Sequence, residues 1–259
     1  MIIIPTIHVT FNPEKPLTVP VNYQHLLQSF VYRLLPEDKA TAIHDQGFLH
    51  HKRVYKPLCF SKLIGPTEYD KNTRKLTFNR KIRLSISSII PEVVETALNN
   101  LMLAENLTLH GQRIYVDNIQ FDRNKITEDR LMVKAVSPIV VYSTFEKRNG
   151  SKITHYFSPQ DLVFEHLIQE NFARKYEAFT GKSLDAEPEL LQIKPLQASH
   201  KDKVITNYKD TWIVGYTGVY ELKAKPEYLS FMLDCGLGSK NAAGFGMVIP
   251  VKEEEDNRT

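Results

Sequence analysis

The apolar residues of this chain change their spacing in the same order twice, and this order constrains the fold more than any other feature. Each half begins as a strand, continues with apolar residues at helical spacing, passes through two further strands, and ends with a second helix and a last strand. Two βαββαβ units in tandem indicate an α+β protein with a duplicated ferredoxin-like fold, whose two sheets line a shared cleft. No sequence repeat accompanies the duplication, so the prediction depends on element order.

The predicted elements follow from spacing, caps and prolines. Strands are expected at residues 2–11, 54–63, 75–87, 107–121, 131–142, 191–197, 212–222 and 245–251, with a hairpin arm at 152–157. Helices are expected from an Asn22 cap to Pro36, from Pro36 to Gly47, from Pro91 to Met102, from Pro159 to Phe179 and from Pro226 to Cys235. The polar stretch 122–130 separates the predicted domains 1–124 and 125–252, and we expect the acidic tail 253–259 to be disordered.

Basic residues are concentrated in one part of the sequence. The chain has a formal net charge of +3, and residues 1–252 alone carry +6 because the tail is acidic. Residues 48–83 contain ten Lys or Arg but only two acidic residues, Glu68 and Asp70. A polyanion is the partner that such a segment favours, since each neutralised phosphate releases counterions; a solvated basic face is the alternative.

Other features exclude several classes of protein. No run of eighteen apolar residues occurs, and the start of the chain lacks the basic and apolar regions of a signal peptide, so we expect a cytoplasmic protein with no membrane contact. Cys59 and Cys235 are solitary and lie near no metal-spaced histidines, so buried free thiols are expected in place of a disulfide or a metal site.

Four of the eleven glycines fall within residues 236–246, which we call the glycine-rich segment. Glycine tolerates positive φ and lets another backbone approach, so this segment predicts a loop that offers amides and the Lys240 cation to an anion such as phosphate. A P-loop is excluded because no Gly-Lys-Ser/Thr follows, and a dinucleotide fingerprint would need glycine at Asn241. A purely structural turn between helix and strand is the alternative.

The glycine-rich segment also carries a resemblance. Gly236-Leu237-Gly238, five residues, and Gly244-Phe245-Gly246 match the C-terminal signature of the Cas six family, the CRISPR-associated endoribonucleases of the RAMP superfamily that cut precursor CRISPR RNA within its repeats. The stretch from Pro20 to Tyr32 and the pair Phe60-Ser61 resemble the N-terminal half of that family, so the likeness extends from about Val19 to Val251.

This resemblance implies an endoribonuclease that needs neither metal nor cofactor. In that family the 2′-hydroxyl of the RNA attacks the adjacent phosphate and leaves 5′-hydroxyl and 2′,3′-cyclic phosphate ends. The reaction needs a base, an acid and a cation for the charged phosphorane. Carried onto this sequence, the proton-transfer roles match His44, as the principal acid–base residue, and Tyr32, and the role of the cation matches Lys56. His50 or His51 is the replacement for His44.

The sequence features of His44, Tyr32 and Lys56 can also be considered without the resemblance. Histidine titrates near neutrality, and the helix end and Asp45 beside His44 favour the imidazolium that an acid requires. A surface or capping histidine is the alternative. Tyr32 is expected to face away from the core, because the apolar positions of its helix centre on the opposite side. Lys56 is either a transition-state contact or one phosphate contact among many.

The predicted partner is CRISPR repeat RNA, bound by a monomer or homodimer, with other effector-complex subunits as further partners. The residues expected to contact RNA are Lys52, Arg53, Arg80, Arg83, Gly236, Gly238, Lys240, Asn241, Gly244 and Gly246. Two alternatives to the enzyme stay open: a subunit that binds CRISPR RNA in an effector complex without cutting it, and a general nucleic-acid-binding protein.

Overall fold

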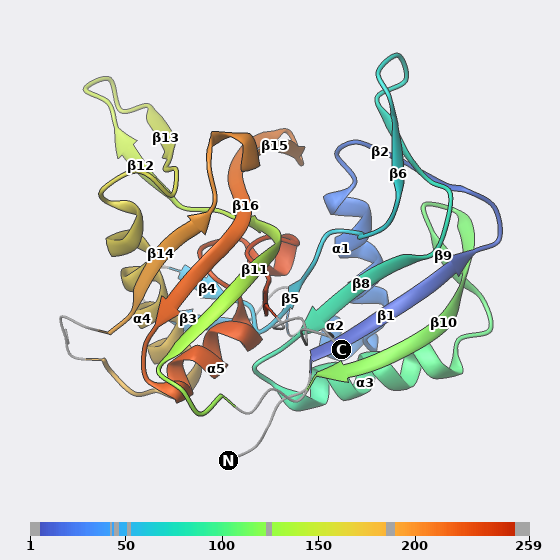
Figure 1. The fold of residues 1–259 in the computed structure, drawn as a ribbon, viewed down its shortest axis with the longest axis horizontal. Helices are drawn as coiled ribbons and strands as arrows, with labels where there is room; N and C mark the ends of the chain where they lie inside the picture. The colour runs from blue at the N-terminus through green and yellow to red at the C-terminus, as the bar shows by residue number, and fades with distance from the viewer. Residues whose placement is uncertain are drawn as a thin grey trace, which may run out of the picture.

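The computed structural model describes residues 6–41, 43, 47–50, 53–122, 126–184 and 190–251. Two antiparallel sheets lie side by side, each packed against two long helices (Figure 1). The chain leaves the first sheet at Asp122 and enters the second at Arg130, so each half of the sequence builds one sheet. The architecture is therefore mixed α+β, as the element order predicts.

The first sheet has the strand order β5-β8-β1-β10-β9, and every neighbouring pair is antiparallel. Its strands are β5 (Cys59–Phe60), β8 (Ile82–Ser87), β1 (Thr6–Pro13), β10 (Gln112–Asp122) and β9 (Leu107–Leu109). Helices α1 (Gln24–Arg33) and α3 (Pro91–Leu103) bury Phe30 and Val94 in a core shared with Val9 of β1.

The second sheet repeats this arrangement with the order β14-β16-β11-β17, and a further strand, β15, pairs with β16. Its strands are β14 (Gln192–Gln197), β16 (Thr211–Lys223), β11 (Arg130–Ile139), β17 (Val248–Pro250) and β15 (Lys203–Tyr208). Helices α4 (Phe164–Thr180) and α5 (Pro226–Cys235) pack Phe172 and Leu229 into its core.

Short elements surround the two sheets. They are β2 (Leu17–Pro20), α2 (Glu37–Thr41), β3 (Phe48–His50), β4 (Arg53–Tyr55), β6 (Thr67–Asp70), β7 (Lys75–Phe78), β12 (Tyr142–Glu146), β13 (Lys152–Tyr156), η2 (His200–Asp202) and η3 (Asn241–Ala243). The hairpin β12–β13 confirms the predicted arm and rises above the second sheet (Figure 1).

Several expectations about elements need correction. The helix expected from Pro159 begins at Phe164. The predicted strand 54–63 is split into β4 and β5, and the predicted strand 75–87 is split into β7 and β8. Asn22 does not cap α1, whose N-cap residue is Tyr23. The Asn22 side-chain oxygen instead accepts hydrogen bonds from the Thr206 hydroxyl and the Asn207 amide of β15, so it joins the two halves of the chain.

The two halves also meet along buried backbone. The Ser87 hydroxyl at the end of β8 lies 3.3 Å from the Leu233 carbonyl oxygen and 3.1 Å from that of Asp234.

Cys59 and Cys235 are buried free thiols, as expected. Among the described residues, no helix has both the length and the apolar character needed to cross a membrane.

Candidate nucleic-acid interface

The glycine-rich segment connects α5 to β17 and is packed tightly on both sides. All four of its glycines have positive φ. A Cβ atom on Gly238 would lie 2.5 Å from the carbonyl oxygen of Val140, and one on Gly244 would lie 2.7 Å from the ring of Phe60 in β5. The segment therefore contacts both halves of the chain, and side chains larger than hydrogen do not fit at these positions.

Asn241 organises the interior of this segment. Its amide nitrogen donates to the carbonyl oxygens of Leu237, at 3.0 Å, and Phe245, at 3.1 Å, which lie on the two arms of the segment. The side-chain oxygen accepts a hydrogen bond of 2.6 Å from the ammonium of Lys175 in α4. Asn241 was expected to contact RNA together with Lys240; the residue is 7% exposed, and its side chain faces the interior of the segment.

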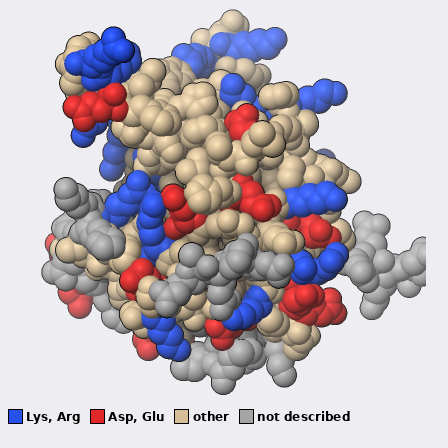
Figure 2. Space-filling model, turned by 90° about the vertical axis from the view of Figure 1, so that its left-hand side faces the viewer, with Lys and Arg blue, Asp and Glu red and all other residues tan. Residues whose placement is uncertain are grey.

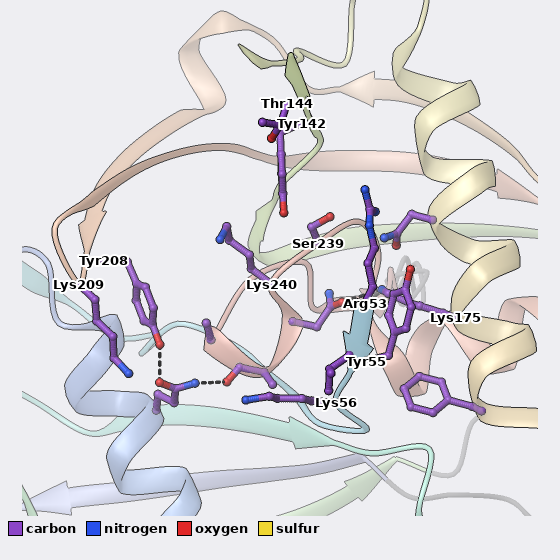
Figure 3. A pocket seen from close by; sticks show the side chains of 17 residues that line it. Arg53, Tyr55, Lys56, Tyr142, Thr144, Lys175, Tyr208, Lys209, Ser239 and Lys240 are labelled. Carbon is purple, nitrogen blue, oxygen red and sulfur yellow. Dashed lines mark hydrogen bonds between the residues drawn. The ribbon is translucent and has the colours of Figure 1, made fainter. Parts of the chain in front are cut away.

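A cavity of about 560 Å³ opens beside the glycine-rich segment (Figure 3). Five of its lining residues are basic: Arg53, Lys56, Lys175, Lys209 and Lys240. None of the described residues that line it is acidic. On the face shown in Figure 2, by contrast, basic and acidic residues are interspersed. The cavity therefore concentrates positive charge, which would attract and stabilise a bound phosphate.

Lys240 reaches the cavity from the segment itself. Its backbone has a φ of 66°, and its ammonium lies 5.6 Å from the ring centroid of Tyr142, within the range of a cation–π contact. Partial burial lowers the pKa of the Lys240 ammonium below its ordinary value. An anion beside this group would offset the lost hydration.

Aromatic side chains form other parts of the wall. Tyr142 comes from β12, Tyr55 from β4 and Tyr208 from β15 (Figure 3). The hydroxyl of Tyr208 donates to the side-chain oxygen of Gln28, and the Gln28 amide donates to the Ala242 carbonyl oxygen at 2.7 Å. Burial raises the pKa of Tyr208, so its hydroxyl stays protonated as a donor. Cations next to aromatic rings suit nucleotides, because bases stack on rings while phosphates pair with cations.

A second cavity, of about 430 Å³, shares two lining residues with the first. Gln28 and Lys209 line both, and the second also includes Tyr32 and His25 of α1. Tyr32 is only 9% exposed, so the expectation that it faces away from the core is wrong. The chain after α1 covers this side of the helix: Ala40 of α2 packs against the core and lines the same cavity.

Only some of the histidines predicted for the site lie among the residues that the structure describes. His44, the predicted acid–base residue, lies outside the described residues, as do His51 and Lys52. His50 lies on β3 with its Nε2 atom 3.5 Å from Glu177 Oε2 of α4, and it lines neither cavity.

His25 was not predicted as a site residue. It is exposed in the Tyr32 cavity, and its Nδ1 lies 3.1 Å from the Asn22 carbonyl oxygen, so Nδ1 carries the hydrogen and Nε2 is the acceptor in the neutral ring.

The remaining basic residues that were predicted to contact RNA or the transition state occupy different surfaces. Arg53 and Lys56 line the first cavity. Arg83 lies with Lys62 and Lys134 in a separate cavity of about 680 Å³, formed between residues of the two sheets. Arg80 is exposed in the connection between β7 and β8. The predicted RNA contacts are therefore distributed over more than one surface.

One further cluster has the composition of a hydrolase triad. The Nδ1 atom of His8 lies 2.7 Å from the Ser85 hydroxyl, and its Nε2 atom lies 2.9 Å from the Asp122 carboxylate. Ser85 is 1% exposed between strands of the first sheet, and none of the three residues lines the cavities described above. A substrate has no access to this hydroxyl. Among the described residues, no group of His, Cys, Asp or Glu is arranged to hold a metal ion.

Comparisons with known proteins agree with this architecture. Residues 18–120 match the family model "CRISPR-associated protein Cas6, N-terminal", and residues 121–249 match "CRISPR associated protein Cas6, C-terminal". The chain belongs to the Cas6 family.

One curated relative and two solved structures illustrate the likeness. The chain is 27% identical to "CRISPR-associated endoribonuclease Cas6 2" of Methanocaldococcus jannaschii, over 94% of this chain and 98% of the relative. A structure titled "Characterization of a Cas6-related gene from Pyrococcus furiosus" matches with a TM-score of 0.80 and 20% identity, over 96% of this chain and 99% of that one. Another, titled "An RAMP protein binding different RNA substrates", matches with a TM-score of 0.77 and 18% identity, over 96% and 100%.

Proposed function

We propose that this protein is an endoribonuclease that cleaves precursor CRISPR RNA within its repeats. The observation that carries the proposal is the first cavity, in which five basic side chains and no described acidic one surround a space beside the glycine-rich segment. Relatives named as CRISPR-associated endoribonucleases match almost the whole chain and support the same activity.

The proposed reaction uses the RNA as its own nucleophile and needs no metal ion. A base removes the 2′-hydroxyl proton, the 2′-oxygen attacks phosphorus, and an acid protonates the departing 5′-oxygen. The products are a 2′,3′-cyclic phosphate and a 5′-hydroxyl. Negative charge accumulates on the phosphorane oxygens, so cations held in a partly water-excluded cavity lower the barrier. Lys56 is proposed as the main cation in the first cavity, with Lys240 beside it.

Tyr32 and His44 are proposed to transfer the protons. Tyr32 lines a cavity that shares Gln28 and Lys209 with the basic cavity, and this proximity supports a role for Tyr32. The exposed ring of His25 opens into the same cavity, so His25 is the first described residue to test if His44 is dispensable. Each proton-transfer group is expected to contribute about 10²- to 10⁴-fold in rate.

We also propose that each half is a ferredoxin-like domain, with the boundary near residues 124–125. The strand orders β5-β8-β1-β10 and β14-β16-β11-β17 are equivalent, and their neighbouring strands are antiparallel. The cavity with Lys62, Arg83 and Lys134 is then a second place at which RNA crosses between the domains.

Incubation of the purified protein with repeat RNA in EDTA tests the activity. The proposal predicts cleavage at one position, a cyclic phosphate on the upstream product, and no cleavage when a 2′-deoxyribose occupies that position. Cleavage of the deoxy substrate would show a different nucleophile. Tight, salt-sensitive binding without any product would favour the non-cleaving CRISPR RNA-binding subunit instead, and equal binding of repeat and scrambled RNA would favour a general nucleic-acid-binding protein.

A further inference from the structure

Lys175 of α4 is buried beneath the glycine-rich segment. Lys175 is 5% exposed, and its ammonium donates to the Gly236 carbonyl oxygen at 2.9 Å and to the Asn241 side-chain oxygen at 2.6 Å. Gly236 begins the segment and Asn241 lies at its middle. One side chain from a different element therefore connects two points of the segment to a long, well-packed helix.

Asn241 extends this connection to both arms of the segment. Its amide bonds the carbonyl oxygens of Leu237 and Phe245. A Cβ atom on Gly236 would lie 2.7 Å from the Asn241 amide nitrogen, and one on Gly246 would lie 2.6 Å from it. Two of the signature glycines are thus needed to leave room for the amide that Lys175 holds.

The charge of Lys175 is unusual for a buried group. Among the described residues no carboxylate forms an ion pair with it, and the thiols of Cys59 and Cys235 interact with its charge. Burial lowers the pKa of Lys175, and the two thiols act weakly in the opposite direction. A buried cation without an anion costs stability, and Lys175 also lines the cavity that holds four other cations. An anion that enters the cavity would reduce this cost.

We propose that Lys175 is a positioning residue: through Gly236 and Asn241 it holds the glycine-rich segment in the conformation that directs Lys240 into the cavity for an RNA phosphate. Lys240 directly precedes Asn241 and has a positive φ, so fixing the Asn241 side chain fixes the direction of its neighbour. The inference rests on the proposed function, because it takes RNA as the ligand of the cavity.

The variant Lys175→Met tests the proposal, since methionine keeps the apolar stem and removes the donors. With repeat RNA that carries 2′-deoxyribose at the cut site, we expect the dissociation constant to rise about 10- to 100-fold, the range for loss of a charged hydrogen bond. With cleavable RNA at saturation, the single-turnover rate should fall as well, because the displaced Lys240 is one of the cations proposed to stabilise the phosphorane. Lys182→Met removes an exposed lysine just beyond α4 and should change neither value.

A double-mutant cycle separates positioning from general stability. Because Lys175 acts through Asn241 as well as Gly236, the variant Lys175→Met/Asn241→Ala should lose less binding free energy than the sum of the two single losses. Additive losses, or a Lys175→Met protein that binds within 2-fold of the parent, would overturn the proposal. Should Lys175→Met not fold, Lys175→Gln keeps one neutral donor and allows the same comparison.

Hydrogen exchange in the RNA-free protein distinguishes this proposal from the function on which it rests. Faster exchange of the amides at 237–246 in Lys175→Met, with unchanged exchange in β11 and β16, is the expected result. Equal exchange would contradict the tie between Lys175 and the segment. If the parent protein neither binds nor cuts repeat RNA, the proposed function is wrong whatever the exchange measurement shows.

Discussion

Lys240 and Asn241 are neighbours in the sequence and have different roles. The Asn241 side chain forms two hydrogen bonds inside the glycine-rich segment and a third with Lys175 of α4, whereas Lys240 extends toward Tyr142 at the wall of the cavity. Tyr32 belongs to a third kind of position, since it is buried among apolar residues and still borders a cavity. At the scale of single residues, the structure therefore separates groups that shape the site from groups that a ligand can reach.

The variant Tyr32→Phe isolates the proposed role of one hydroxyl. Phenylalanine keeps the buried ring, so the fold is retained, and we expect the single-turnover cleavage rate to fall about 10²-fold or more if the hydroxyl transfers a proton. Tyr23→Phe is the matched control: the Tyr23 hydroxyl is buried near the same helix and accepts from the Leu63 amide. That control should lose about 1 kcal/mol of stability and keep the parental cleavage rate. Equal rates for all three proteins would remove Tyr32 from the mechanism.

The sequence predicted the glycine-rich segment but not the direction of Asn241, because its partner Lys175 lies 66 positions away in the chain. The error for Tyr32 has a similar origin. Helical periodicity defines the face of α1 that packs on the sheet, but it contains no information about a second cover such as α2. His25 was missed because an exposed histidine has no distinguishing pattern until a cavity is known.

At the scale of elements, the glycine-rich segment, α1 and β15 form one contact region. Gln28 of α1 bonds Ala242 of the segment and Tyr208 of β15, while Asn22 bonds Thr206. The strand β15 was not predicted, since its polar and apolar residues do not alternate regularly; Ile205 is 56% exposed. The helices α3 and α5 were predicted to within a residue or two, because prolines define their first turns.

Two glycines with the same φ allow the packing of the segment to be tested. Gly246 and Gly111 both have a φ of 72°, but a Cβ on Gly246 would lie 1.9 Å from the Leu237 carbonyl oxygen, whereas nothing lies within 4 Å of one on Gly111. Gly111→Ala should cost about 1–2 kcal/mol through its backbone conformation alone. Gly246→Ala adds a backbone collision and should cost clearly more in urea unfolding. Similar costs would mean that the segment is loosely packed.

The contact between α1 and the segment gives a second element-scale prediction. Gln28→Leu leaves the buried Ala242 carbonyl oxygen and the Tyr208 hydroxyl without their partner, so we expect a loss of about 2 kcal/mol in the free energy of unfolding. Ser29→Ala changes an exposed neighbour on the same helix and should leave stability within about 0.5 kcal/mol of the parent. If both variants unfold at the same urea concentration as the parent, this contact does not hold the halves together.

At the scale of the whole molecule, the two sheets are joined by buried polar contacts, and titration at this junction affects global stability. Asp234 lies at the end of α5, where Ser87 of the first half approaches its carbonyl oxygen. Burial raises the pKa of the Asp234 carboxyl to about 8. The adjacent C-terminal end of the helix dipole acts in the same direction.

The raised pKa of Asp234 predicts a pH dependence of stability with a defined sign. Between about pH 4 and pH 8 the folded protein keeps a proton that the unfolded chain has lost, so the free energy of unfolding contributed by this group falls as the pH rises. The total fall is on the order of 3 kcal/mol for this partly exposed side chain. Asp234→Asn should flatten this part of the profile in urea unfolding measured from pH 5 to pH 9. Parallel profiles for the variant and the parent would contradict the assignment.

The central claim is that RNA occupies the basic cavity beside the glycine-rich segment, and a crystal structure with repeat RNA carrying 2′-deoxyribose at the cut site tests it most directly. The account predicts the uncleaved phosphate in this cavity, within hydrogen-bonding distance of the ammonium groups of Lys56 or Lys240. Well-ordered RNA bound at another surface, with this cavity empty of nucleotide, would contradict it.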